Sequence, residues 1–126
     1  MLNAYKQAAE PDRGAVLTKA VIRASDRLGI HGRLLAEVIG VSEAQISRFR
    51  SGDAALAERT KPFELAALLV RAFRSLDAII GGDESAARAW LNAQNLALGT
   101  RPVERITSVQ GLTDVVAYLD ARRAPL

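Results

Sequence analysis

The chain of 126 residues contains no cysteine and a single histidine, His31. Without cysteine, the chain can form no disulfide bond, no thiolate metal site and no thiol nucleophile. A lone histidine supplies no second imidazole for a metal site and disfavours Ser–His catalysis. These absences favour a binding protein over an enzyme, and we expect neither a metal ion nor a cofactor.

Long apolar runs are also missing. No run approaches the roughly 18 residues that a membrane span requires. The first residues lack the basic stretch followed by an apolar one that marks a secretion signal. We therefore expect a cytoplasmic protein with no membrane partner.

Charge of one sign is in small excess, with a net charge of +3. Residues 1–63 hold 10 basic and 7 acidic side chains, whereas residues 64–126 hold 7 of each. A surface that attracts nucleic acid is therefore expected in the first half of the chain.

Aromatic residues make up only 5% of the chain, and β-branched residues never alternate with polar ones over a run. Apolar residues instead recur at intervals of three and four, between glycines and prolines, which predicts an all-α fold of about eight helices. We expect these helices at residues 16–28, 32–39, 42–51, 54–59, 62–80, 84–91, 102–106 and 109–122.

The helices divide into two predicted domains. Residues 1–12 show no periodic pattern and are expected to be a flexible lead-in. Residues 13–70 are expected to form the first domain and residues 71–126 the second. Because each is small, we expect mutual packing or dimerisation to stabilise both.

The most specific pattern lies between Arg33 and Gly52. Two short helices meet at Gly40, and glycine tolerates the positive φ that a helix-turn-helix turn needs. Ser42 and Gln45 match the S-x-x-Q capping box at the start of the second helix. With Ile46 turned inward, the opposite face of that helix would enter the major groove of DNA.

The candidate DNA-binding residues lie on this face or flank it. Arg48 suits a bidentate contact with guanine, or a simple pair with a neighbour. Gln45 suits either a contact with an adenine base or completion of the capping box at the start of this helix. The flanking cations suit either contacts with phosphates or simple exposure to solvent. His31 is expected to help cap the helix at residues 32–39. The candidates are Arg33, Ser42, Glu43, Ala44, Gln45, Ser47, Arg48, Arg50 and Lys61.

The segment Leu35–Gly52, LAEVIGVSEAQISRFRSG, resembles the helix-turn-helix of the Xre family of bacterial regulators. The second half resembles the toxin-binding domain of Xre/MbcA/ParS-type antitoxins. That resemblance rests on Ala89, Trp90, Leu91, Asn95, Leu98, Gly99, Arg101, Pro102, Thr107, Gly111 and Leu119.

The resemblance implies an Xre-like helix-turn-helix bundle followed by a small helical toxin-binding domain. It implies an antitoxin whose partner is an NAD+-consuming RES-domain toxin encoded by the adjacent gene. The first half would dimerise and bind the operator DNA of its own promoter, while the second would cover the active-site cleft of the toxin. The toxin-binding residues would be Trp90, Asn95, Arg101, Pro102, Tyr118, Arg122 and Arg123.

The residues alone leave alternatives open. Trp90 suits a core as well as an interface, and the basic tail that begins at Arg122 suits an anionic cleft or solvent. Gly111, inside the last helix, indicates close packing or a kink. A stand-alone transcriptional regulator, with a dimerising or ligand-sensing second half, is the alternative to an antitoxin.

Overall fold

The computed structural model describes residues 12–123, which form seven helices and no strand. The all-α prediction is confirmed. The helices are α2 (Arg13–Leu28), α3 (Gly32–Ile39), α4 (Glu43–Ser51), α5 (Lys61–Ile80), α6 (Glu84–Asn92), α7 (Pro102–Arg105) and α8 (Val109–Arg123). Within this part of the chain, no helix is long and apolar enough to cross a bilayer.

The predicted lead-in lies outside the described residues except for its last member, Asp12. Asp12 is the N-cap of α2, because its carboxylate accepts a hydrogen bond from the Ala15 backbone N–H at 3.0 Å. The helix consequently begins at Arg13, earlier than the apolar pattern indicated. The apolar pattern could not place this cap, because residues 1–12 show no periodic pattern.

The helix predicted over residues 54–59 is wrong, because a tertiary contact takes the backbone of this segment. The Leu56 N–H donates to the Thr18 hydroxyl at 2.8 Å, and that hydroxyl donates to the Gly14 carbonyl at 2.6 Å. A Cβ built on Gly14 would lie 2.1 Å from the Leu56 carbonyl oxygen. The segment is therefore held against the first turn of α2.

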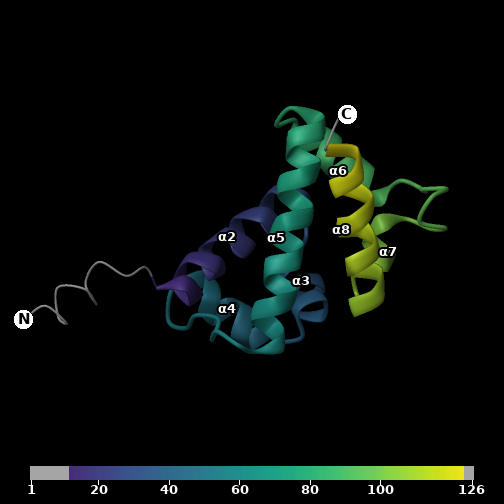
Figure 1. Ribbon diagram of the computed structural model, residues 1–126. Coiled ribbons are helices and arrows are strands. Elements are labelled where there is room, and N and C mark those ends of the chain that lie inside the picture. The colour runs from purple at the N-terminus through teal and green to yellow at the C-terminus, as the bar shows by residue number, and fades with distance from the viewer. Residues whose placement is uncertain (1–11, 124–126) are drawn as a thin grey trace, which may run out of the picture.

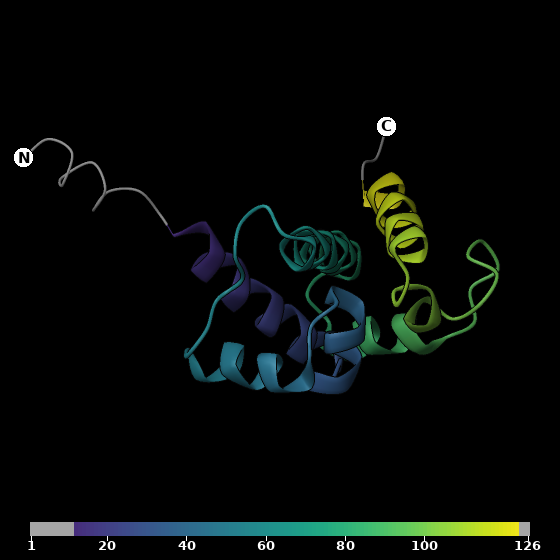
Figure 2. The same cartoon turned by 90° about the horizontal axis from the view of Figure 1, so that it is seen from below.

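Helix α5 runs through the middle of the molecule (Figure 1). On one side it packs against α2 and α3, and on the other against α6 and α8. Turned by 90°, the molecule shows α4 below α2, while α8 stands apart from both (Figure 2). One continuous apolar core joins residues from both halves, such as Val21 and Leu35 with Leu112 and Leu119.

The apolar residues of α5, which recur at helical spacing in the sequence, are not all buried. Leu69 and Leu76 are buried, whereas Ile79 near the end of the helix is 42% exposed. Ser75 is fully buried, and its hydroxyl donates to the Asp120 carboxylate on α8 at 2.7 Å. A hydrogen bond between side chains therefore crosses the interface between α5 and α8.

Gly111 is buried in the first turn of α8 against the end of α7. A Cβ at this position would lie 1.8 Å from the Arg105 carbonyl oxygen. The prediction of close packing is thus confirmed. The side chains of Arg105 and Asp114 form an ion pair across the same junction.

Gly111→Ala is expected to lower the free energy of unfolding. Forcing a methyl group into a packed site costs about 1–3 kcal/mol, more than the gain of up to about 1 kcal/mol in helix propensity. Urea denaturation followed by circular dichroism measures the change. Gly32→Ala is the control, because the nearest atom to a Cβ there is at an ordinary 3.7 Å. Equal stability of the two variants would contradict the close contact.

Candidate functional site

Helices α3 and α4 form the helix-turn-helix that the sequence predicted. Gly40 ends α3 with φ at 76°, and its N–H donates to the Ala36 carbonyl at 2.9 Å. Ile46 and Phe49 are buried on the inner face of α4. The outer face of α4 is thereby turned to solvent.

The start of α4 differs in one respect from the predicted capping box. The Ser42 hydroxyl accepts from the Gln45 backbone N–H at 3.0 Å, which confirms Ser42 as the N-cap. The Gln45 side-chain oxygen instead accepts from Arg48 Nε at 3.0 Å and Arg48 Nη2 at 2.7 Å. A charged donor on the next turn thus takes the oxygen that a capping box would use.

The exposed face of α4 carries the candidates expected there. Gln45 is half-buried, and the others are exposed, namely Glu43, Ala44, Ser47 and Arg48. Arg33 is exposed in the first turn of α3. His31 occupies the N-cap position of that helix, but its side chain makes no capping hydrogen bond, so the expected capping role is wrong.

Two of the flanking cations are engaged within the chain. Arg50 Nη1 lies 2.9 Å from the Asp26 carboxylate, and Lys61 Nζ lies 3.1 Å from the Glu64 carboxylate. Exposed pairs of this kind contribute about 0–1 kcal/mol. A phosphate could therefore replace either carboxylate at small cost.

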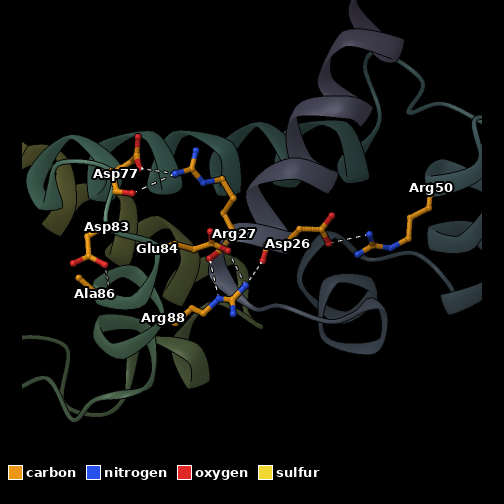
Figure 3. Close-up of polar contacts among 9 residues, drawn as sticks. Asp26, Arg27, Arg50, Asp77, Asp83, Glu84, Ala86 and Arg88 are labelled. Atoms are coloured by element: carbon orange, nitrogen blue, oxygen red, sulfur yellow. Dashed lines mark hydrogen bonds and ion pairs between the residues drawn. The ribbon is translucent and has the colours of Figure 1, made fainter.

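A polar network joins the first half of the chain to α6 (Figure 3). The Arg88 guanidinium donates to the backbone carbonyls of Asp26 at 2.9 Å and Arg27 at 3.2 Å, and it pairs with Glu84 at 2.8 Å. These carbonyls lie in the last turn of α2, where the helix dipole favours a cation, although the Asp26 carbonyl also accepts from the Gly29 N–H at 3.2 Å. Sequence reasoning missed Arg88, since its acceptors lie about sixty positions away along the chain.

Trp90, Tyr118 and Arg122 lie side by side across α6 and α8. The rings of Trp90 and Tyr118 stack with centroids 6.1 Å apart, and the Arg122 guanidinium lies 4.5 Å from the Tyr118 centroid. Trp90 also packs against the core and is half-buried. We call these three residues the aromatic strip.

The loop between α6 and α7 is built by other candidates. The Asn95 side-chain oxygen accepts from the Leu98 N–H at 3.2 Å, and its backbone N–H donates to the Thr100 carbonyl at 3.2 Å. Leu96 at the loop tip is 97% exposed. Arg101 pairs with Glu104 at 3.4 Å. Asn95 therefore stabilises the conformation of the loop through both its side chain and its backbone.

Pro102 requires a correction. Its ring is buried at the start of α7, so it offers no surface to a partner. Proline suits this position because the first residue of a helix needs no N–H. The prediction that Pro102 contacts the toxin is replaced by a role in beginning α7.

The carboxylate of Glu104, beside Pro102, is held in its charged form. The Thr100 hydroxyl donates to it, and Arg101 adds a second contact. These contacts lower the pKa of Glu104 below its usual value.

Arg123 lies apart from the aromatic strip, because it points toward α5. Its guanidinium contacts the Ser75 hydroxyl at 3.5 Å, beside the pair of Arg71 and Asp120 at 2.5 Å. The hydrogen bond from Ser75, followed by Arg71, lowers the pKa of Asp120. The rest of the basic tail, residues 124–126, lies outside the described part of the chain.

The α3–α4 geometry and the second helical unit define a helix-turn-helix protein with an additional domain. The family model for the antitoxin Xre-like helix-turn-helix domain matches residues 7–71, more than half of the chain. The model for the antitoxin Xre/MbcA/ParS C-terminal toxin-binding domain matches residues 75–124. The chain therefore belongs to the Xre-like antitoxins, and it is the antitoxin of a toxin–antitoxin system. A search of curated proteins finds no match.

Asp120→Asn is expected to make stability less dependent on pH. Because folding lowers the pKa of Asp120, ionised Asp120 stabilises the wild type above about pH 4, and this stabilisation is lost as the pH falls through the lowered pKa. The variant should therefore unfold at lower urea concentration than the wild type at pH 7, with a smaller difference at pH 3.

The exposed carboxylate of Glu37 on α3 provides the control. Glu37→Gln should change the urea midpoint little at either pH. A deficit of Asp120→Asn that is equally large at pH 7 and pH 3 would show that the charge of Asp120 is not what stabilises α8 on α5.

Proposed function

We propose that this antitoxin neutralises an NAD+-consuming RES-domain toxin encoded by the adjacent gene, and that it has no enzymatic activity of its own. One observation supports toxin binding and DNA binding by one chain, while the RES domain and its NAD+ chemistry follow from the resemblance to Xre/MbcA/ParS-type antitoxins. The residues that match a toxin-binding domain fold onto the same core as the helix-turn-helix, so one compact chain presents both surfaces. We place this activity in the cytoplasm, where the toxin and the operator DNA both lie.

The aromatic strip is the proposed centre of the toxin-binding surface, which also includes Asn95 and Arg101 between α6 and α7 and Arg123 at the end of α8. Tyr118 and Trp90 supply large apolar area, which favours interface contacts. Arg122 is exposed and would pair with carboxylates of the kind that bind ribose hydroxyls in dinucleotide sites. Covering those carboxylates would exclude NAD+ from the toxin.

Co-expression with the adjacent reading frame, with only its product tagged, tests the proposal. We expect the antitoxin to co-purify, the tagged protein to be toxic only when expressed alone, and cellular NAD+ to fall under that condition. Toxicity without loss of NAD+ would retain the antitoxin and overturn the proposed chemistry. Without a complex or toxicity, the stand-alone regulator becomes the better description.

A surface substitution is the sharper variant for this experiment, because truncating α8 would remove the buried Leu112 and Leu119 and unfold the chain. Arg122→Glu should weaken the complex about tenfold or more by reversing a charge at the interface. Arg33→Glu, which reverses the same charge on an exposed residue of α3, is the matched control and should bind the toxin normally.

For the helix-turn-helix, we propose that α4 enters the major groove of the operator and that a homodimer reads two half-sites. Arg48 would contact a guanine edge, held in place by its bonds to Gln45. The N-terminus of α4 at Ser42 suits a phosphate, as do the cations Arg33, Arg50 and Lys61. Glu43 would repel phosphates and favours a cytosine amino group.

Arg48→Ala is expected to lower operator affinity about tenfold or more, since a bidentate base contact is worth about 1–3 kcal/mol. Fluorescence anisotropy with promoter DNA measures the affinity. Arg74→Ala removes the same charge from α5, outside the helix-turn-helix, and should leave affinity within a fewfold of wild type. If both variants bind equally, α4 is not the reading helix.

A further inference from the structure

A groove on the face of α2 and α5 shares only Arg123 with the two proposed surfaces. It encloses about 610 Å³ and lies open to solvent between α2 and α5 near the end of α8. Its floor is apolar, formed by Val16, Leu17 and Ala20 from α2 and by Phe63, Ala67 and Val70 from α5. A contiguous apolar surface with a polar border is typical of an interaction site.

Each wall of the groove follows helical spacing. Phe63, Ala67 and Val70 recur at intervals of four and three along α5, and Leu17 and Ala20 are three apart on α2. Val16 beside them is 60% exposed. Leu17, Ala20 and Phe63 are partly exposed and Ala67 is exposed, while Val70 is buried beneath them. Two neighbouring helices with such partly exposed apolar residues form a seat for a third amphipathic helix.

The border of the groove selects the charge of its occupant. Arg13 lies on the α2 side, while Arg71, Arg74 and Arg123 lie on the side of α5 and α8. Among the described residues that line the groove, four are arginines and none is acidic. An occupant with carboxylates on both flanks of an apolar face would meet a cation on each side.

Two of the four border arginines pair with carboxylates of this chain, so the charge open to a partner centres on Arg74 and Arg123. Arg13 pairs with Glu58 at 3.5 Å and Arg71 pairs with Asp120, but the side chains of both arginines are mostly exposed. Arg74 has no carboxylate within ion-pair distance among residues 12–123. A carboxylate-bearing helix would therefore gain contacts without dismantling a buried ion pair.

The same charges argue against a second copy of this chain as the occupant. A symmetric contact would bring the arginine border of one copy against that of the other, and like charges at an interface are strongly unfavourable. The exposed position of the cations also differs from a small-anion site, in which the charged groups are enclosed with the ligand.

We infer that the groove docks an acidic amphipathic helix supplied by the toxin. The inference rests on the proposed function, because the toxin is the protein partner of the neighbouring domain. Arg123 borders the groove and also ends α8, the last helix of the toxin-binding match. A toxin bound along α8 therefore reaches the groove directly, and the antitoxin would hold it at two separate places.

The absence of cysteine from the chain allows a direct test. Ala67→Cys places one thiol in the groove, and Ala78→Cys places one on exposed α5 outside it. Reaction with a maleimide is followed by mass spectrometry for the free antitoxin and for its complex with the full toxin. We expect Cys labelling at position 67 to slow at least tenfold in the complex, with position 78 labelled equally in both.

Each other outcome overturns the inference in a distinguishable way. If the toxin co-purifies and position 67 still reacts freely, the toxin does not use the groove and the proposed function stands. If position 67 is protected in the free antitoxin, increasingly so at higher concentration, a second copy occupies it. If no complex forms, the proposed function fails together with the inference.

Charge complementarity has its own readout in the same complex. Arg74→Glu should accelerate labelling at position 67 in the complex several-fold by repelling the acidic helix, and higher salt should act in the same direction. Arg74 is exposed, so this substitution leaves the fold intact, which the thermal midpoint verifies. Labelling that is insensitive to both changes would exclude an acidic occupant.

Discussion

Burial of α5 on two sides is the constraint on which the rest of the structure depends. Each half of the chain would be marginally stable alone, since domains of about 50 residues bury a smaller fraction of their surface than larger domains do. Leu69 and Leu76 of α5 belong to one core that also contains Leu35 from the helix-turn-helix and Leu112 from α8. The two family matches, to residues 7–71 and 75–124, meet within this helix. The boundary between the matched segments is therefore a continuous helix and not a linker, so the two halves share their stability.

Arg88 adds a polar link to this apolar one. Its guanidinium donates from α6 to two carbonyls in the last turn of α2, and Arg27 makes a second link to Asp77 on α5 at 3.8 Å. Asp26, whose carbonyl accepts from Arg88, also pairs through its side chain with Arg50 at the end of α4 (Figure 3). A chain of contacts thus runs from α6 to the helix proposed to read DNA. A toxin held on α6 and α8 would keep a fixed position relative to α4 of the same chain.

The sequence predicted what local chemistry determines. Glycines that accept positive φ and side chains that cap helices placed most helix ends, as at Gly40, Ser42 and Asp83. Prediction from the sequence failed where a contact elsewhere in the fold, or a competing side chain, determines the local structure. The Thr18 hydroxyl takes the backbone of Leu56, so no helix forms over residues 54–59. Gln45 bonds Arg48 because a charged donor lies one turn away, and Pro102 is buried because α7 packs against α6 and α8. The groove was not predicted, because its walls come from α2 and α5, whose residues in the groove lie more than forty positions apart in the sequence.

Ion pairs within the folded chain engage part of the positive charge that the first half could offer to nucleic acid. The excess of basic residues there indicated nucleic-acid binding, yet several of these cations have carboxylate partners, among them Arg13, Arg27, Arg50 and Lys61. On the outer face of α4 itself, Glu43 offsets Arg48. Phosphate contacts supply most of the affinity of a DNA-binding protein, and each adds to its dependence on salt. If α4 binds the operator as proposed, a single chain offers little electrostatic attraction, and several copies held together would bind more tightly because the effective concentration of the second site is high. A toxin that held more than one antitoxin would in this way strengthen the proposed repression of their operon.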